Sequence, residues 1–530
     1  MTYPRARPVG EAAATLELGN TVDPALNARV RGIDEALRAE PFPGFRESVP
    51  THCSLLVLYD PAKTGFEEVR HALEGRARGP ASSAPPGRLH SIPVVYGGAD
   101  CEDVASARGL SKEDVAALHS SVDYTAYMLG FMPGFAYLGP LPEALEVPRR
   151  TTPRVRVPAG SVAIAGRLTA VYPAATPGGW SLIGRTSIRL FDPHRDPPCL
   201  IQAGDRVRFQ PARELLRPAE APAPHAPSTS STVEVLDGGL LTTVQDLGRF
   251  GHRRHGVAWG GAVDVPALRA ANRLVGNGPD AAGLECTVAG PALRFLAPAR
   301  LAVTGADLGA VLHREDLGPW PVPRGTAVVA RAGNRLVFTG RRAGCRAYVA
   351  FQGGLDVPLV LGSRATDLGT GFGGHEGRAL RAGDHLALGA SRAEPARIAP
   401  PPAPAARSTL RVVLGPQEDH FTPASVARFL SEEYAVTAAS DRVGCRLEGA
   451  PLAHLRGGEI PSDGLVPGSV QVPPDGRPIV ALADGPTTGG YPKVATVIGA
   501  DLPLLAQALG GEGRVRFEAL SVEEARQAAR

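Results

Sequence analysis

The stretch DGPTTGGYPKVATVI, residues 484–498, has a counterpart in the first half of the chain, YPAATPGGWSLIGRT, residues 172–186. Both carry Pro and Thr followed by Gly-Gly and an aromatic residue. A second pair, VPAGSVAIAG (157–166) and GLVPGSVQVPPDG (464–476), shares a Pro, Gly-Ser-Val core and precedes the first pair in the same order. We interpret the two pairs as divergent repetition of one β unit.

A weaker third relative lies in the middle of the chain. RALRAGDHLAL (378–388) matches CLIQAGDRVRF (199–209), so the unit is expected in up to three copies. The distance between the copies is that of whole domains and not of a solenoid repeat. The 63 Gly and 51 Pro residues punctuate short apolar runs, which favours many short strands joined by turns.

Two Pro/Ala-rich segments with few large apolar residues divide the chain and are typical of semi-rigid linkers. The predicted fold class is mainly β, with a small α/β N-terminal domain and several β-barrel domains. The expected segments are a small α/β domain (1–90), a first barrel (91–212), a linker (213–231), a second barrel domain (232–392), a linker (393–408) and a last barrel (409–530).

Helical patterns are few. Apolar residues at Leu26, Val30, Ile33 and Leu37 predict a helix near the N-terminus, and SLLVLYD (54–60) predicts a buried strand. Further short helices are expected at FEEVRHAL (66–73), at SKEDVAALHS (111–120) with capping-box spacing, and at VPALRAANRLVG (265–276).

Bulk composition narrows the class of protein. The chain has 530 residues, 43% hydrophobic and 21% charged, with a net charge of +3, which gives no case for nucleic acid or an anionic membrane as partner. We find no apolar run of the roughly 20 residues that cross a bilayer and no signal peptide. The six cysteines are scattered without metal-ligand spacing, so we expect a cytoplasmic protein with reduced thiols and no metal site.

Lysine occurs only at Lys63, Lys112 and Lys493, and Lys493 lies inside the repeated loop. A compact ammonium at that place is suited to holding a carboxylate or phosphoryl oxygen or stabilising an oxyanion, and the alternative is a lysine reaching solvent from a strand edge. On the first interpretation, Lys493→Arg lowers turnover strongly and leaves thermal stability nearly unchanged.

Neighbouring residues complete the candidate site. Asp484, Thr487 and Thr488 supply an acceptor and hydroxyls and are, with Lys493, the candidate catalytic residues. Gly489 and Gly490 would let a ligand approach the backbone, although a tight hairpin explains the same residue types.

The first half offers further candidates for substrate binding. Trp180 is placed to stack on a planar ligand or to cap a barrel end. Arg185 and Arg149 either bind an anion through paired hydrogen bonds or are ordinary surface arginines. Residues 127–142, YMLGFMPGFAYLGPLP, predict an apolar wall or an interface loop, with Phe135 and Tyr137 as candidate contacts.

The remaining polar cluster, Gln245, Asp246, Arg249 and Asp264, precedes the helix at 265–276. The cluster is either a buried network that fixes the start of the domain or part of a ligand site, and we favour the buried network. No P-loop, G-x-S-x-G or H-E-x-x-H motif occurs, and no biotin-attachment sequence is present.

Several long motifs carry a family resemblance. IPVVYGG, YMLGFMPGFAYLG, PRRTTPRVRVPAGSVAIAG and YPAATPGGWSLIGRT resemble the KipI-type family, also called allophanate hydrolase subunit 1 or the B-type subunit of 5-oxoprolinase. TTVQDLGRFGHRRHGV, SDRVGCRLEG and DGPTTGGYPKVATVI resemble the KipA-type family, or the C-type subunit of 5-oxoprolinase. The chain therefore looks like a natural B–C fusion, related to the carboxyltransferase part of urea carboxylase.

The resemblance implies cyclophilin-like barrels, one in the B part and two in the C part. It implies ATP-dependent hydrolysis of 5-oxoproline to glutamate with a separate A-type subunit, using ATP with Mg²⁺. It also implies that the two halves pack together and that the fused chain forms a homodimer. From the matching motifs, Arg442 and Tyr491 are added to the substrate-binding candidates.

Two alternatives stay open. The first is a biotin-dependent carboxyltransferase component acting on urea or a similar amide, with carboxybiotin supplied by another protein. The second is a regulatory module that occupies a kinase through the apolar 127–142 loop.

Overall fold

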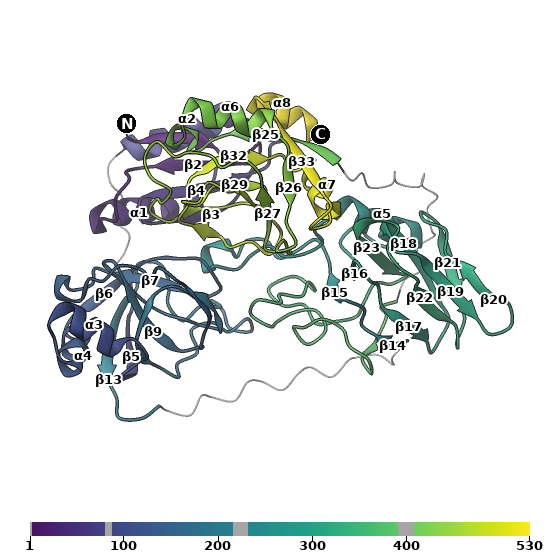
Figure 1. The fold of residues 1–530 in the computed structure, drawn as a ribbon, viewed down its shortest axis with the longest axis horizontal. Coiled ribbons are helices and arrows are strands. Elements are labelled where there is room, and N and C mark those ends of the chain that lie inside the picture. Colours follow the sequence, from purple (N-terminus) through teal and green to yellow (C-terminus); the bar gives the residue numbers. More distant parts are fainter. Residues whose placement is uncertain (1–2, 80–86, 216–231, 391–406, 530) are drawn as a thin grey trace.

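The computed structural model describes residues 3–79, 87–215, 232–390 and 407–529. The expected linkers at 213–231 and 393–408 fall almost entirely outside the described residues. The described parts form four units, and Figure 1 shows the first and last of them packed together above the other two. The N-terminal unit thus lies beside the C-terminal unit, although nearly the whole chain separates them.

The N-terminal unit is a four-stranded antiparallel sheet in the order β1-β2-β4-β3 with two helices on one face. Its elements are β1 (Arg5–Pro8), β2 (Ala13–Glu17), α1 (Pro24–Ala39), β3 (Phe45–Pro50), β4 (Ser54–Tyr59) and α2 (Phe66–Arg78). The predicted helical stripe is confirmed, because Val30, Ile33 and Leu37 are buried on α1.

The sheet is buried on both faces, which explains why β4 is continuously apolar from Leu55 to Leu58. Leu55 and Val57 pack with the helices, whereas Leu56 and Leu58 join Val466 of the C-terminal unit in a separate apolar cluster. The period-2 alternation of a strand therefore sends one set of side chains into the domain's own core and the other into the contact with the C-terminal unit.

The second unit is a closed barrel of seven strands, β10-β7-β6-β13-β5-β12-β9, which we call barrel 1. Its elements are β5 (Leu89–Tyr96), α3 (Cys101–Arg108), α4 (Lys112–Ser120), β6 (Asp123–Leu129), β7 (Ala136–Gly139), β8 (Arg154–Val157), β9 (Ser161–Ala165), β10 (Leu168–Val171), β11 (Thr176–Gly178), β12 (Ser181–Arg185) and β13 (Arg206–Pro211). The predicted capping box is present, with Ser111 accepting from the Asp114 backbone N–H at 3.0 Å.

The third unit differs from the expected barrel. Its strands form a six-stranded sheet, β20-β19-β22-β17-β14-β24, and a five-stranded sheet, β15-β16-β23-β18-β21, without closing hydrogen bonds between the two among the described residues. Its elements are β14 (Val233–Asp237), β15 (Leu241–Gln245), α5 (Val265–Val275), β16 (Gly283–Thr287), β17 (Ala292–Phe295), β18 (Ala299–Asp307), β19 (Ala310–Arg314), β20 (Gly318–Pro321), β21 (Ala327–Ala330), β22 (Arg335–Phe338), β23 (Ala343–Phe351) and β24 (His385–Leu386).

The physical reason for this difference is the pairing of the segment that resembled barrel 1. In barrel 1, β13 pairs with two strands, parallel to β5 and antiparallel to β6, and so closes the barrel. In the third unit the matching strand, β24, has only two residues and pairs with β14 alone. A shared apolar core, which includes Leu284, Phe295 and Phe351, holds the two sheets together.

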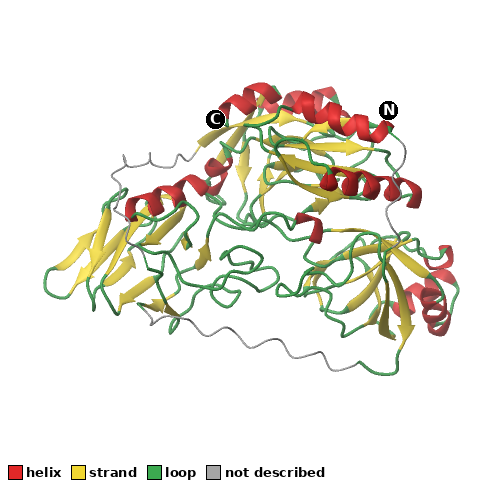
Figure 2. Cartoon of the chain, turned by 180° about the vertical axis from the view of Figure 1, so that it is seen from behind, coloured by secondary structure: helices red, strands yellow, loops and turns green. Residues whose placement is uncertain are grey.

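The last unit is again a closed seven-stranded barrel, β25-β32-β29-β30-β27-β26-β33, which we call barrel 2. Its elements are β25 (Arg407–Leu414), α6 (Pro423–Ser431), β26 (Tyr434–Val436), β27 (Gly444–Glu448), β28 (Asp463–Gly464), β29 (Ser469–Gln471), β30 (Ile479–Ala481), β31 (Thr488–Gly489), β32 (Lys493–Val497), α7 (Leu502–Gln507), β33 (Arg514–Leu520) and α8 (Val522–Ala528). Figure 2 shows several of the helices along the outer edge formed by the N-terminal unit and barrel 2.

Within the described residues, no helix is long and apolar enough to cross a membrane.

A buried histidine of barrel 1 makes folding sensitive to acid. His119 is 0% exposed and lies between Tyr96 and Thr169, each 2.8 Å from one ring nitrogen. The Thr169 hydroxyl donates to the Ala163 carbonyl, so His119 Nε2 donates to Thr169 and Nδ1 accepts from Tyr96. Burial lowers the pKa of His119 to about 3.

We predict a loss of stability in weak acid. The contribution of His119 is complete above its unfolded pKa of 6.5 and is lost as pH falls toward the folded value, by up to about 1.4 kcal/mol per pH unit. Urea unfolding at pH 7 and pH 5 should show a shallower pH dependence for His119→Gln than for wild type. His71→Gln, at an exposed position on α2, is the matched control and should keep the wild-type slope. An unchanged slope in His119→Gln would contradict this account.

Candidate functional site at the junction of the two halves

The repeated loop at 484–493 lies where barrel 2 meets barrel 1, the third unit and the N-terminal unit. Thr488 accepts a hydrogen bond from the Phe131 backbone N–H of barrel 1 at 3.2 Å. This close approach requires glycine at position 130, because a Cβ there would lie 2.0 Å from the Thr488 hydroxyl. At the two ends of the loop, Asp484 binds Arg442, which also binds Glu285 of the third unit. Lys493 binds Asp463, which also accepts from Ser54 of the N-terminal unit.

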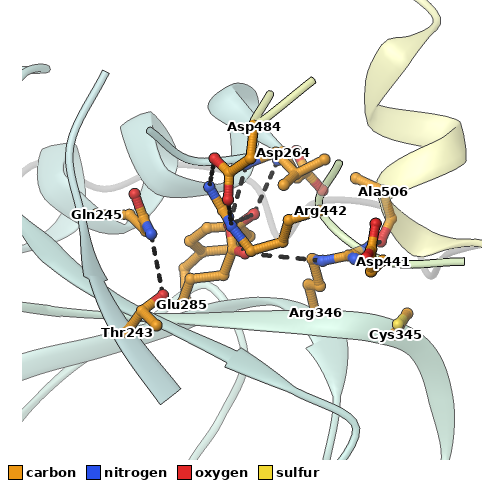
Figure 3. Close-up of polar contacts among 12 residues, drawn as sticks. Thr243, Gln245, Asp264, Glu285, Cys345, Arg346, Asp441, Arg442, Asp484 and Ala506 are labelled. Carbon is orange, nitrogen blue, oxygen red and sulfur yellow. Dashed lines mark hydrogen bonds and ion pairs between the residues drawn. The ribbon is translucent and has the colours of Figure 1, made fainter. Parts of the chain in front are cut away.

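Asp484 is held by Arg442, which is 4% exposed. The guanidinium donates a two-pronged pair of hydrogen bonds to Asp484, both at 2.8 Å, and also binds Glu285 of β16 and the Gly261 carbonyl. Figure 3 shows Arg442 between the two carboxylates. Burial opposes ionisation of Glu285, but the guanidinium groups of Arg442 and Arg346 hold its pKa below the usual value.

The network continues to α7. Tyr348 donates to Glu285 at 2.7 Å, and Gln507 donates to Asp264, the residue that caps α5, also at 2.7 Å. Of the polar cluster expected before α5, Asp264 therefore joins the third unit to barrel 2, and Asp246 accepts from Ser363 and from the Arg364 backbone N–H within the third unit.

Lys493 is fully buried, with 0% exposure. Its ammonium lies 2.5 Å from Asp463 and 3.1 Å from the Gly464 carbonyl. The carboxylate of Asp463 also accepts from Gln417 at 3.0 Å and from Ser54 and Thr15 of the N-terminal unit. This ion pair therefore lies on the contact between the N-terminal unit and barrel 2.

Beside Asp463 is a cavity of about 230 Å³. One wall comes from the N-terminal unit and the other from barrel 2. Its polar lining consists of Tyr3, Arg5, Glu17, Asn20, Cys53, Ser54, Gln417, His420, Arg456, Glu459 and Asp463. We call it the junction pocket. A smaller cavity of about 120 Å³ on the same contact is lined mostly by apolar residues and is the weaker candidate.

Two carboxylates of the junction pocket have opposite electrostatic environments. Burial raises the pKa of Glu17, and the nearby Asp463 carboxylate raises it further. Burial also opposes ionisation of Asp463, but the ammonium of Lys493 and the hydrogen bonds to it hold that pKa below its usual value. Gln417 donates toward both, at 3.4 Å and 3.0 Å, and so fixes their separation. Carboxylates whose pKa values are pushed apart are suited to acid–base chemistry.

Sequence reasoning found part of this arrangement. Lys493 was singled out, but its partner Asp463 and the residues Glu17 and Gln417 were missed. An available signal was Asp463 itself, because it directly precedes the repeated GLVPGSV segment and a buried lysine requires an anion.

Other predicted residues have packing contacts in place of an open ligand surface. Phe135, Tyr137 and Trp180 are buried in one aromatic cluster of barrel 1, with ring centroids 5.0–5.9 Å apart. Arg185 is exposed on β12, where it pairs with Val95 of β5. The apolar 127–142 segment contains the end of β6 and all of β7, and most of its side chains are buried in barrel 1. It therefore does not form an exposed docking surface.

The remaining loop residues lie in or beside the two-stranded sheet of β28 and β31. Thr487 is fully buried, and its carbonyl accepts from the Leu465 N–H at 2.9 Å. A Cβ at Gly489 would lie 2.5 Å from Gln471, so this glycine serves close packing. The carbonyls of Gly490 and Tyr491 accept from Ile460 and Gln471.

Comparison with known proteins divides the chain into two halves, one on each side of the segment expected as a linker at 213–231. Residues 4–201 match the family described as carboxyltransferase domain, subdomain C and D, and residues 255–519 match carboxyltransferase domain, subdomain A and B. The chain belongs to this carboxyltransferase-domain family. It joins in one polypeptide the sequences of the B-type and C-type subunits of 5-oxoprolinase.

The relatives support each half separately. The C-type subunit of 5-oxoprolinase from Escherichia coli K12 is 40% identical over 55% of this chain and 93% of its own length. The B-type subunit of 5-oxoprolinase from Escherichia coli O157:H7 is 46% identical over 39% of this chain and 95% of its own length. The predicted fusion is therefore confirmed.

Two solved structures are similar to this chain, one over nearly its whole length and one over about half of it. The crystal structure of TTHA0988 is 38% identical, covers 96% of this chain and 99% of its own, and superposes with a TM-score of 0.83. The Kluyveromyces lactis urea carboxylase is 30% identical over 56% of this chain and 28% of its own, with a TM-score of 0.51.

We predict that Lys493→Met destabilises the chain by about 3–5 kcal/mol, because it leaves the buried Asp463 charge without a partner. The burial also changes the expectation for Lys493→Arg, whose larger head must displace packed neighbours at a cost of about 1–3 kcal/mol. Urea unfolding is the measurement.

The double variant Lys493→Met/Asp463→Asn should be more stable than Lys493→Met alone, since no buried charge remains. Lys112→Met is the control, because Lys112 is 51% exposed and pairs with Glu102 on the surface. A double variant less stable than Lys493→Met would contradict the ion-pair interpretation.

Proposed function

We propose that this chain is the fused B–C component of an ATP-dependent 5-oxoprolinase, which hydrolyses 5-oxoproline to glutamate together with a separate A-type subunit. The names of the relatives of both halves support this reaction. The observation that carries the proposal is the junction pocket, whose two carboxylates come from different halves. Neither half alone contains the pair.

The pocket suits a small polar substrate. A cavity of about 230 Å³ accommodates a five-membered lactam with one carboxylate and is below the usual range for larger ligands. Arg456, which is 46% exposed at the pocket and 4.0 Å from Asp419, is the available cation for the substrate carboxylate. Arg5 is already paired with Glu17.

Each carboxylate has a distinct role in this mechanism. Hydrolysis adds water to the lactam carbon, breaks the C–N bond and delivers a proton to the nitrogen. Glu17, with its raised pKa, takes the proton of the attacking water and returns it to the leaving nitrogen. Asp463 stays ionised beside Lys493 and, through Gln417, fixes the position of Glu17; Lys493 is thus a positioning residue.

ATP, when bound, would supply the phosphoryl group that activates the lactam oxygen, and this group would leave as inorganic phosphate. Asp484, Thr487 and Thr488, proposed from sequence as catalytic, hold the loop that carries Lys493. Mg²⁺ would accompany ATP, and among the described residues no group of three His, Cys, Asp or Glu side chains converges on one point. A homodimer of the fused chain and a cytoplasmic location remain part of the proposal.

A second function has one specific observation in its favour. The likeness to the Kluyveromyces lactis urea carboxylase covers 56% of this chain, so a carboxyltransferase component acting on urea is the alternative. Biotin would then be carried by another protein. Turnover of carboxybiotin with urea, in the absence of 5-oxoproline hydrolysis, would favour this alternative.

We expect ATP-dependent glutamate release from 5-oxoproline by the chain mixed with an A-type subunit from the same source. Glu17→Gln should lower kcat at least about a hundredfold, because a general base contributes that much or more. Glu234→Gln is the matched control, since Glu234 is an ion-paired glutamate of the third unit. Activity of Glu17→Gln equal to the control would overturn the assigned base.

The acidic limb of the pH–rate profile gives an independent test. Because Glu17 must be ionised to accept a proton, the rate should rise with pH through a pKa above the usual 4.5. Arg5 lowers the pKa of Glu17, so Arg5→Gln should move this limb to higher pH. A limb that does not move, or moves to lower pH, would assign the titration to another group.

A further inference from the structure

Barrels 1 and 2 are copies of each other, strand by strand. Starting from the first strand, barrel 1 runs β5-β13-β6-β7-β10-β9-β12 and barrel 2 runs β25-β33-β26-β27-β30-β29-β32. In each barrel the first and last strands in sequence pair in parallel. Each barrel also carries a small two-stranded antiparallel sheet at the same place in the chain, β8 with β11 and β28 with β31.

The mouths of the two barrels are built alike. After the first strand, Asp100 in barrel 1 accepts from the Leu182 backbone N–H at 2.7 Å. Gln417 in barrel 2 accepts from the Lys493 backbone N–H at 3.1 Å. Leu182 and Lys493 are equivalent, because each is the third residue after the second glycine of its Gly-Gly-aromatic motif.

The register of the two small sheets identifies the next equivalence. Arg154 of β8 pairs with Gly178, and Asp463 of β28 pairs with Gly489. Both glycines are the first of their Gly-Gly pair, so Arg154 occupies in barrel 1 the place of Asp463 in barrel 2. Arg154 contacts Asp100 at 2.5 Å, as Asp463 contacts Gln417 at 3.0 Å.

The charge at this place is reversed. The mouth of barrel 2 carries the carboxylate of Asp463, whereas that of barrel 1 carries arginines. Arg150 and Arg154 both donate to Asp100, which is 2% exposed, and their own side chains are 37% and 25% exposed. Arg149 is exposed beside them and close enough to act on His52, Tyr137 and Tyr172.

The arginine cluster has unused hydrogen-bond capacity. The Nη1 of Arg154 is buried and has no hydrogen-bond partner. A buried donor without an acceptor costs free energy, and a bound oxyanion would supply one. The guanidinium groups outnumber the single carboxylate of Asp100, so the mouth has an excess of positive charge that attracts an anion.

We propose that the mouth of barrel 1 binds a phosphate group, held by Arg149, Arg150 and Arg154. A guanidinium group can donate two hydrogen bonds to a pair of phosphate oxygens, and a terminal phosphate group has three oxygens available for such bonds. The phosphate has two sources, a nucleotide such as ATP or free inorganic phosphate. The site stands on the geometry of the barrel mouth, and only its assignment to ATP rests on the proposed function.

The test is isothermal titration calorimetry of the full chain with inorganic phosphate, with pyrophosphate and with ATP. Each should bind wild type, and Arg149→Ala should weaken binding by at least about tenfold. Arg149 is the primary variant because no ion pair holds it among the described residues, so its removal leaves the contacts of Asp100 intact. The double variant Arg150→Ala/Arg154→Ala should lose binding altogether.

The matched control is Arg206→Ala/Arg208→Ala. These arginines also share one carboxylate, Asp123, on the same barrel, and each is 51% exposed. Binding that the control weakens as much as the cluster variants would reduce the effect to general surface charge and overturn the proposal.

Arg456→Ala separates the two sites. Loss of phosphate binding in Arg456→Ala with retention in Arg149→Ala would place the anion in the junction pocket and overturn the proposal. Tighter binding of ATP than of phosphate identifies a nucleotide site, and the reverse order identifies a phosphate site. No binding of any probe to wild type refutes the site, whatever the result of the glutamate-release assay.

Discussion

The ion pair between Lys493 and Asp463 is the contact on which the arrangement of the two halves depends. A fully buried ammonium is costly unless a carboxylate and further hydrogen bonds accompany it, and both lie within 3.1 Å. The same carboxylate accepts hydroxyl donors from the N-terminal unit. Separating the N-terminal unit from barrel 2 would therefore expose a charged pair and the apolar face of β4 together.

This constraint also places the candidate chemistry. Glu17 lies at the end of β2, and its raised pKa needs both the burial that the contact provides and the ionised Asp463 nearby. Asp463 stays ionised because Lys493 lies beside it. Structure and electrostatics are thus coupled, because the pair that closes the contact between the halves also sets the protonation of the pocket.

The sequence could predict the repeated elements, and much less of what lies between them. The repeat of Gly-Gly-aromatic and Gly-Ser-Val segments marked the two closed barrels correctly because those residues form matching strands and turns in each copy. The third unit was expected as a barrel because 378–388 resembles 199–209. Closure depends on the pairing of that strand with two neighbours, which local sequence does not encode.

The site was harder to predict for a related reason. Lys493 could be found because lysine is rare in this chain. Glu17 could not, since it lies in an ordinary five-residue strand and gains its environment from Gln417 and Asp463, hundreds of positions away. Trp180 and Tyr137 were drawn into the prediction by residue type, whereas their burial follows from packing against one another.

Barrel closure explains how one mouth can carry acids and its copy arginines. A closed barrel pairs all its strands and leaves no edge, so the closure of the sheet does not depend on the side chains at the mouth. Those positions are free to change as long as the buried group after the first strand still accepts from the equivalent backbone N–H. Asp100 and Gln417 both satisfy that requirement. The covering partner then selects the charge: in barrel 2 the N-terminal unit closes over the mouth and brings hydroxyls and Glu17, whereas in barrel 1 the arginines stay accessible to an anion from solution.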